Sequence, residues 1–230
     1  MLPLRALLTR SAAATSAAAA VLLLRDQTTD SDETGETVSG VPVPRGGASL
    51  GLRAVEVLSR HLGERGEGKK GTPGYHRSPF IDRVNRGIHN DAPRLVGVPW
   101  CARAVRYAYE VAAQELGLPP PFAGMGALAS VSNWKGAAFR PYFLAAPKVG
   151  AVLLLGDQHA TLVAQALGDG KVVTIEGNHG DAVANVKRTL RPQDTLVDVE
   201  SFVAARQSAV VGSGLDLLGV GPWQNMEVWS

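Results

Sequence analysis

The stretch that decides the fold is GVPWCARAVRYAYEVAAQELG, residues 97–117, the strongest helical segment of the chain. Pro99 stands near its start, where proline is favoured, and Gly117 ends it. Between them, apolar residues recur at helical spacing: Cys101, Val105, Ala108, Ala112 and Leu116. The pattern predicts a long helix that carries the only cysteine of the chain in its first turn.

The composition is that of an ordinary soluble globular protein, with 230 residues and 45% apolar content. This length allows one substantial domain with tails, or two small ones. The net charge of +2 comes from interspersed basic and acidic residues, which gives no case for nucleic-acid binding. A single cysteine excludes a disulfide scaffold and the multi-cysteine zinc patterns.

The N-terminal region divides into two segments before the ordered domain. Residues 1–25 have two arginines in the first ten positions, then a short apolar run of small residues. This layout predicts a secretory signal or an uncleaved membrane-proximal anchor, although no clear cleavage site follows the run, and an Ala-rich helix is the alternative. Residues 26–47 are rich in Thr, Ser, Asp, Glu, Gly and Pro, which predicts a disordered linker.

The predicted ordered domain covers residues 48–205, and residues 206–230 are predicted to form a C-terminal tail. Helical patterns at residues 49–64 and 80–88 precede the cysteine helix. Later the periodicity changes to two, which predicts four short strands: Gly150–Leu155, Ala160–Leu167, Lys171–Gly177 and Asn185–Arg191. Helices followed by antiparallel strands predict an α+β domain, with the N-terminal helices packed on a small antiparallel sheet.

The position of Cys101 favours chemistry at its thiol. A helix N-terminus carries about half a positive charge, and cysteines placed there can have a strongly lowered pKa. Amide cleavage by a thiolate also needs a proton carrier for the leaving amine, usually a histidine. His159 in GDQHATLV stands where a strand begins, so the sheet would hold it at an open rim.

A partner that orients His159 is expected from the next strand, which contains TIEGNHG. If Gly168 and Asp169 are the central turn residues, Thr161 faces Glu176 and His159 faces Asn178. If the central residues are Asp169 and Gly170, the pairing shifts by two residues and Thr161 faces Asn178. In both registers Glu176, Asn178 and His159 lie on one side of the hairpin, because side chains alternate with period two. Either residue could therefore accept a hydrogen bond from the imidazole, as the third member of a triad does.

The segments PWCARAVRYA, HATLVAQ and TIEGNHGDAV together resemble the CHAP family, the cysteine- and histidine-dependent amidohydrolases/peptidases of the papain-like superfamily. The likeness extends over roughly residues 50–191. The chain departs from the family in having Gly150-Ala151 where Gly-Asp is frequent, and Ala-Thr after His159. These departures affect packing more than chemistry.

The resemblance implies a papain-like fold and a cysteine peptidase or amidase that needs no cofactor. Cys101 matches the nucleophile, His159 the general base and acid, and Glu176 the orienting acid. Asn178 matches a residue that orients the histidine or binds the oxyanion. The implied substrate is peptidoglycan, cleaved at the N-acetylmuramoyl–L-alanine amide or within the peptide stem or cross-bridge.

The same resemblance sets expectations for partners and location. We expect a monomer that is secreted, periplasmic or wall-associated, with a phage lysin or a cytoplasmic protein as alternatives. Membrane contact is expected only through the N-terminal segment. Trp100 is expected to pack under the helix start and shield the thiolate, beside the substrate. Asn133 and Trp134 are expected to line a substrate groove, the alternative for Trp134 being a core position.

Other interpretations of the same residues remain open. A lone cysteine in an apolar helix is more often a small buried hydrophobe. A CHAP-like module without turnover could bind cell wall or a secretion partner, and an amine in place of water would make the enzyme an acyl transferase. A metal site is the rival chemistry, from Asp157, His159, His179 and Asp181. It lacks the known zinc motifs, so no metal is expected.

Overall fold

The structure is a computed structural model. The residues it describes are 35–40, 49–70, 72, 75–87, 98–126 and 128–212. The predicted signal or anchor, residues 1–25, lies outside them, as does most of the predicted linker. The end of the predicted tail also lies outside the described residues.

Within the described residues, seven strands form one antiparallel sheet in the order β1-β6-β5-β4-β3-β7-β2. They are β1 Glu36–Thr37, β2 Phe143–Leu144, β3 Val152–Leu155, β4 His159–Gly168, β5 Lys171–His179, β6 Ala182–Thr189 and β7 Thr195–Val197. The four predicted strands correspond to β3 to β6. The other three have only two or three residues each, too few to show a period-two pattern. The prediction of an α+β protein is confirmed.

The helices in the described part of the chain are α2 Leu50–Ser59, α3 Pro79–Arg86, α4 Cys101–Glu115, α5 Val131–Trp134 and α6 Val199–Gly212, with a 3₁₀ turn at Arg140–Tyr142. Serine side chains cap α2 and α3, because Ser49 and Ser78 accept from the backbone N–H groups three residues on. By contrast, Trp100 at the start of α4 gives no side-chain cap. The first turn of α4 therefore keeps N–H groups for another acceptor.

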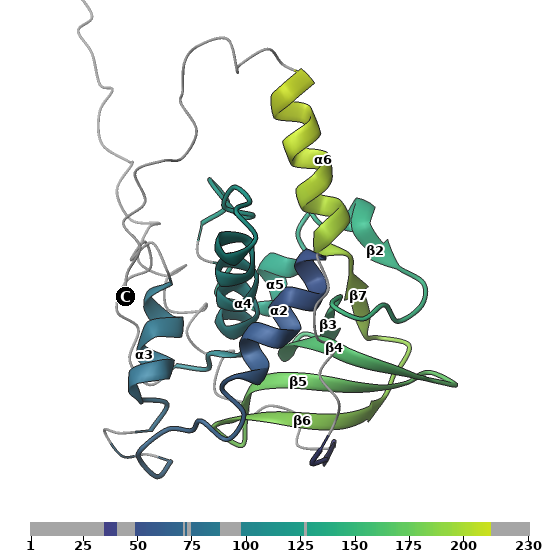
Figure 1. Ribbon diagram of the computed structural model, residues 1–230. Coiled ribbons are helices and arrows are strands. Elements are labelled where there is room, and N and C mark those ends of the chain that lie inside the picture. Colours follow the sequence, from purple (N-terminus) through teal and green to yellow (C-terminus); the bar gives the residue numbers. More distant parts are fainter. Residues whose placement is uncertain are drawn as a thin grey trace, which may run out of the picture.

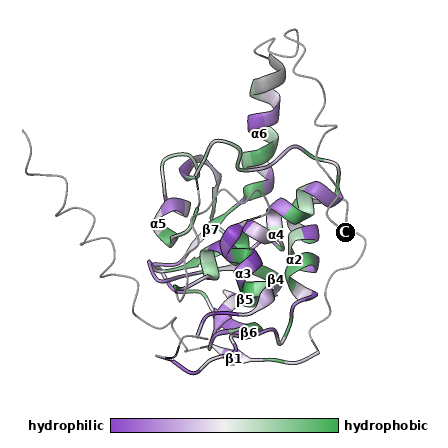
Figure 2. Ribbon diagram, turned by 90° about the vertical axis from the view of Figure 1, so that its left-hand side faces the viewer, coloured by the Kyte–Doolittle hydropathy of each residue, from purple (hydrophilic) through white to green (hydrophobic). Residues whose placement is uncertain are grey.

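Helix α4 packs on β4 and β5, with α2 beside it, and α6 projects away from the sheet (Figure 1). Val152 and Leu154 belong to the apolar cluster under these helices, whereas Leu153 and Leu155 belong to a cluster on the opposite face. All four are buried, which explains why β3 is a continuous apolar run. Helices α2 and α6 instead alternate hydrophobic and hydrophilic stretches along their length (Figure 2). None of the helices in the described part of the chain has the length and apolar character needed to cross a membrane.

Two elements extend past the predicted limits of the ordered domain. Glu36 and Thr37, within the predicted linker, form β1 and pair with Lys187 and Val186 of β6. Helix α6 runs on to Gly212, beyond the predicted end of the ordered domain. Glu200 in its first turn explains the anchoring of this helix, since its carboxylate accepts from the Ser49 hydroxyl and the Leu50 N–H at the start of α2, each at 3.1 Å.

The β4–β5 hairpin combines both predicted registers. At the turn Gly168 pairs with Lys171, so the central residues are Asp169 and Gly170, the second alternative. Two register shifts along the hairpin then change the pairing, and Leu162 pairs with Ile175. The pairing of Leu162 with Ile175 belongs to the first predicted register, in which Thr161 lies opposite Glu176. The bulges thus determine which residues of β5 face the start of β4.

Candidate active site

Cys101 is the first residue of α4 and is only 5% exposed. Its sulfur is stabilised as a thiolate by the backbone N–H groups of Ala102, in the same helical turn, and Ala160, in β4. The position at the positive end of the helix dipole favours the thiolate further.

His159 is the first residue of β4, and its side chain is fully buried. Its backbone is held in the sheet by pairing with Leu155 of β3. The imidazole interacts with Cys101 on one side and with Glu176 on the other. Nε2 lies 2.9 Å from Oε2 of Glu176, and the contact is an ion pair in character because the N–H is not aligned with the oxygen. Nδ1 makes no aligned hydrogen bond either, so the imidazole interacts with both Glu176 and Cys101 through charge rather than through an aligned hydrogen bond.

The electrostatics favour a thiolate–imidazolium pair. Burial raises the pKa of the Cys101 thiol, but the His159 charge and the two backbone N–H groups outweigh it, and the net pKa is lowered. Burial lowers the pKa of His159, yet the neighbouring Cys101 and Glu176 charges raise it to about 10. Both directions favour transfer of the thiol proton to the imidazole at neutral pH. The two groups titrate as one coupled pair.

Glu176 is held by groups from β5 and β6. Arg188 makes a two-pronged ion pair with it, with Nε 2.5 Å from Oε1 and Nη2 2.8 Å from Oε2. The Thr174 hydroxyl donates to Oε1 at 2.5 Å. Burial raises the pKa of Glu176, but Arg188 and His159 together hold it well below its ordinary value. The carboxylate therefore stays ionised and cannot turn away from His159.

Arg188 and Thr174 were missed by the sequence analysis. A signal for both exists in the alternation of the β5–β6 pair, where Glu176 pairs with Ala184 and Thr174 with Val186. This register puts Arg188 on the same face as Glu176 and Thr174. Because a buried carboxylate needs a partner of opposite charge, a basic residue on the same face of the neighbouring strand is expected to pair with that carboxylate.

Asn178 does not follow the alternation that the sequence argument assumed. It is buried, 6% exposed, and its φ of 66° places it in the left-handed region. The β5–β6 register also shifts between Glu176 and His179. The residue placed against the His159 ring nitrogen is Glu176. His179 approaches the same carboxylate, with Nδ1 3.6 Å from Oε2.

Gly177 allows β5 to approach the start of α4. A Cβ at this position would lie 2.5 Å from Cβ of Ala104 and 2.7 Å from Cζ3 of Trp100. Such distances are far below van der Waals contact. The glycine between Glu176 and Asn178 is thus a packing requirement of the site, which brings the carboxylate strand against the cysteine helix.

The three residues predicted to lie at the substrate occupy different places. Trp100 is fully buried, with its indole N–H donating to Oδ1 of Asp181 at 3.2 Å. Trp134 is fully buried among aromatic rings, stacked 5.1 Å from Phe139, so it is a core residue and offers no ring face to a ligand. Asn133 is exposed, and its side chain caps α5 by accepting from the backbone N–H of Ser130.

The residues of the rival metal site are not gathered. The Asp157 side chain is 87% exposed and pairs with Lys135, with Nζ 2.6 Å from Oδ1. Asp181 binds His76 and Trp100, away from that pair. Among the described residues, no group of three or more His, Cys, Asp and Glu side chains is placed to hold a metal ion.

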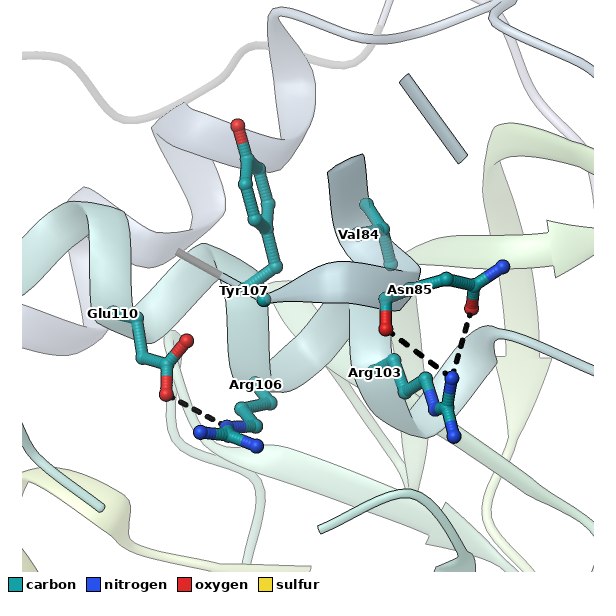
Figure 3. A pocket seen from close by; sticks show the side chains of 7 residues that line it. Val84, Asn85, Arg103, Arg106, Tyr107 and Glu110 are labelled. Atoms are coloured by element: carbon teal, nitrogen blue, oxygen red, sulfur yellow. Dashed lines mark hydrogen bonds and ion pairs between the residues drawn. The ribbon is translucent and has the colours of Figure 1, made fainter. Parts of the chain in front are cut away.

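A small pocket between α3 and α4 is a separate polar feature (Figure 3). In it Arg103 Nη1 donates to the carbonyl oxygen and Oδ1 of Asn85, at 3.3 and 3.4 Å, and Arg106 Nε donates to Glu110 at 2.6 Å. Its free volume of about 10 Å³ has room for one water molecule, not for a sugar or peptide. Arg103 is two residues after Cys101, and in an α-helix this spacing places the two residues on opposite sides. The pocket is therefore not part of the cysteine site.

The chain matches no protein-family model, no curated protein and no solved structure. What the site can do therefore follows from the chemistry of its own groups. A thiolate at a helix N-terminus is a nucleophile, an imidazolium beside it is a proton donor, and a buried carboxylate fixes the imidazolium. Together Cys101, His159 and Glu176 hold the three functions that acyl transfer through a thioester requires.

Proposed function

We propose that the protein is a cysteine-dependent amide hydrolase of the CHAP type, with a papain-like fold, that cleaves peptidoglycan. The observation that carries the proposal is the buried cluster of Cys101, His159 and Glu176, in which the imidazole interacts with both the thiol and the carboxylate. A buried structural cysteine needs neither a histidine nor a helix N-terminus. The lowered pKa of this thiol supports a role as a reagent.

In the first half of the reaction the Cys101 thiolate attacks the carbonyl carbon of the amide, forming a tetrahedral oxyanion. Backbone N–H groups in the first turn of α4, which have no acceptor within the helix, stabilise that charge. The C–N bond then breaks, and the His159 imidazolium gives its proton to the leaving amine. The products of this half are a free amine and a thioester on Cys101.

In the second half the neutral His159 takes a proton from a water molecule, whose oxygen attacks the thioester carbon. The C–S bond breaks, the acid product leaves, and the thiolate and imidazolium are restored. Glu176 stays ionised throughout, because Arg188 and His159 both hold its pKa far below neutrality. Its part is to orient the ring and stabilise the imidazolium, not to exchange protons.

Peptidoglycan is proposed as the substrate from the resemblance of the cysteine, histidine and E-G-N segments to CHAP proteins. The secretory layout of residues 1–25 agrees with a substrate outside the cytoplasm. The scissile bond is then the N-acetylmuramoyl–L-alanine amide or a peptide bond of the stem or cross-bridge. Each of these bonds yields a new amine and a new carboxylate, as the mechanism requires.

The test is digestion of purified peptidoglycan by the full chain, followed by mass spectrometry of the soluble products. Hydrolysis is expected, and the product masses distinguish amidase from endopeptidase cleavage. Cys101→Ala and His159→Ala should each lower the rate by orders of magnitude. The matched control is Asp157→Asn, which removes an exposed carboxylate outside the site and should hydrolyse at the wild-type rate.

Three other outcomes would change the proposal. Sedimentation with peptidoglycan without any released product would favour a binding module with no turnover. Products that carry an added amine in place of water would favour acyl transfer. Hydrolysis that survives Cys101→Ala would exclude the thiol mechanism.

A further inference from the structure

A second buried histidine–carboxylate pair lies beside the cysteine helix. Nδ1 of His76 is 2.5 Å from Oδ1 of Asp181, and the two side chains are only 8% and 11% exposed. The backbone N–H of His76 also donates to Oδ2 of Asp181, at 3.2 Å. One carboxylate thus holds both the ring and the main chain of His76. The proposed reaction uses neither residue.

The carboxylate of Asp181 also reaches the residue before the nucleophile. Its Oδ1 accepts from the indole N–H of Trp100 at 3.2 Å, and Trp100 is fully buried. The carbonyl oxygen of Trp100 accepts from the backbone N–H of Ala104, at 2.8 Å, in the first turn of α4. A movement of the indole would therefore move the start of α4, and Cys101 with it.

The start of α4 lacks the side-chain cap that is present at the starts of α2 and α3. Helices α2 and α3 have serine caps, Ser49 and Ser78, but Trp100 gives no side-chain cap to α4. The indole is fixed by Asp181, by Gly177 of β5 beside the ring, and by edge contact with Phe80, whose ring centroid is 6.0 Å away. Of these contacts only the one with Asp181 is a directional hydrogen bond.

The backbone around the pair is held in uncommon conformations. His76 has a φ of 56° and Asp181 a φ of 60°, both in the left-handed region that non-glycine residues rarely adopt. Gly66 packs so closely that a Cβ there would lie 1.9 Å from Oδ2 of Asp181. Its backbone N–H donates to the carbonyl of Asp181, at 3.0 Å. Such strain persists where the surrounding contacts over-determine the geometry.

We propose that His76 and Asp181 are positioning residues for Cys101, acting through the Trp100 indole. His76 orients the Asp181 carboxylate, Asp181 fixes the indole, and the indole fixes the first turn of α4 relative to His159. Neither residue touches the reacting atoms, so neither is a catalytic residue. This inference rests on the proposed role of Cys101 as the nucleophile.

The most selective variant is Trp100→Phe, which keeps an aromatic ring and removes the N–H that Asp181 accepts. Asp181→Asn and His76→Leu break the same chain at its other two links. His76→Asn should restore function relative to His76→Leu, because its side-chain amide can donate from about the position of Nδ1. The control is Asp82→Asn, which removes an exposed ion pair in the same region, between Asp82 and Nη2 of Arg77 at 2.8 Å. This ion pair does not involve Trp100.

The measurements are the pH titration of the Cys101 thiolate by ultraviolet absorbance and the rate of Cys101 alkylation, with urea unfolding of each variant. We expect Trp100→Phe, Asp181→Asn and His76→Leu to raise the apparent pKa of the thiol. We expect them to slow alkylation at neutral pH by about tenfold or more, since small misplacements of reacting groups have large effects on rate. His76→Asn should recover most of the rate, and Asp82→Asn should match the wild type.

The outcomes separate this inference from the proposed function. If the variants lose stability but keep the wild-type thiol pKa and alkylation rate, the pair is a structural link and the positioning role is wrong. The same conclusion holds if His76→Asn and His76→Leu behave alike. If the wild-type thiol itself titrates as an ordinary cysteine, the proposed function is wrong, and the positioning role is overturned with it.

Discussion

Nε2 of His159 lies 2.9 Å from Oε2 of Glu176, and neither side chain has any exposed surface. Two charges buried in this way are stable only if the whole cluster is balanced. Here negative and positive groups alternate: the Cys101 thiolate, the His159 imidazolium, the Glu176 carboxylate and the Arg188 guanidinium. The formal charge of the cluster is therefore zero. The alternation explains how the protein keeps a thiolate in its interior at neutral pH.

Glu176→Gln should lower the pKa of His159 from its value of about 10, because the variant lacks one of the two negative charges that raise it. The thiol pKa should rise in turn, since a less basic imidazole is a weaker acceptor of the thiol proton. The measurement is the NMR titration of the His159 ring in both proteins. An unchanged His159 titration would contradict the assignment of Glu176 as its partner.

Arg188→Leu should destabilise the fold by about 3–5 kcal/mol, the usual effect of removing one partner of a buried ion pair. The reason is that the Glu176 carboxylate would lose both guanidinium contacts, at 2.5 and 2.8 Å, while staying buried. Urea unfolding measures the loss. The control is Arg140→Leu at an exposed position, which should cost far less. Equal effects of the two substitutions would show that the Arg188 contact adds nothing.

Glu176 also predicts the direction of acid sensitivity. Its pKa in the folded protein lies well below the ordinary value of 4.5, so the unfolded chain takes up the proton first as the pH falls. The stability that Glu176 contributes is therefore present above about pH 4.5 and is lost as the pH falls toward the folded-state pKa. Unfolding free energies measured across this range should fall more steeply in the wild type than in Glu176→Gln. Parallel curves would argue against a depressed pKa.

Gly177→Ala should destabilise the protein by about 1–3 kcal/mol, the usual effect of overpacking a well-packed site. The added methyl group would lie 2.5 Å from Cβ of Ala104 and 2.7 Å from the Trp100 ring, so α4 and β5 must separate. Because the separation moves Cys101 away from the strand that carries Glu176, hydrolysis should fall as well. Denaturation midpoints and peptidoglycan digestion test the two effects. Wild-type stability in this variant would mean that the helix and the strand can separate without cost.

The sequence predicted the parts of the fold that depend on local periodicity. The cysteine helix and strands β3 to β6 were found because their apolar residues repeat over at least four positions. Strand β1 was missed because its two residues are defined only by pairing with distant β6. Helix α6 runs past the predicted end of the domain, and there Arg206 Nη2 donates to the carbonyl oxygen of Ala123 at 2.8 Å, a contact that no local pattern reveals.

The parts of the candidate site that follow strand alternation could be predicted from the sequence, and the parts that depart from it could not. Counting along the hairpin placed both Glu176 and Asn178 on the same side as His159 and left open which of them contacts it, because the bulges that decide the pairing give no clear sequence signal. Asn178 lies past the point where the alternation ends, as its φ of 66° shows. Trp134 was assigned to a substrate groove on residue type alone, which does not distinguish a ligand contact from a core position.

The central claim is that Cys101 and His159 form a thiolate–imidazolium pair. The most direct test is the rate of alkylation by iodoacetamide against pH, in the wild type and in His159→Ala. Because the chain has one cysteine, the rate reports Cys101 alone. We predict fast alkylation well below the ordinary thiol pKa of 9.0 in the wild type, and an inflection at higher pH in the variant, which lacks the His159 charge and hydrogen bond that lower the thiol pKa. A wild-type inflection near 9.0 that the substitution leaves unchanged would contradict the account.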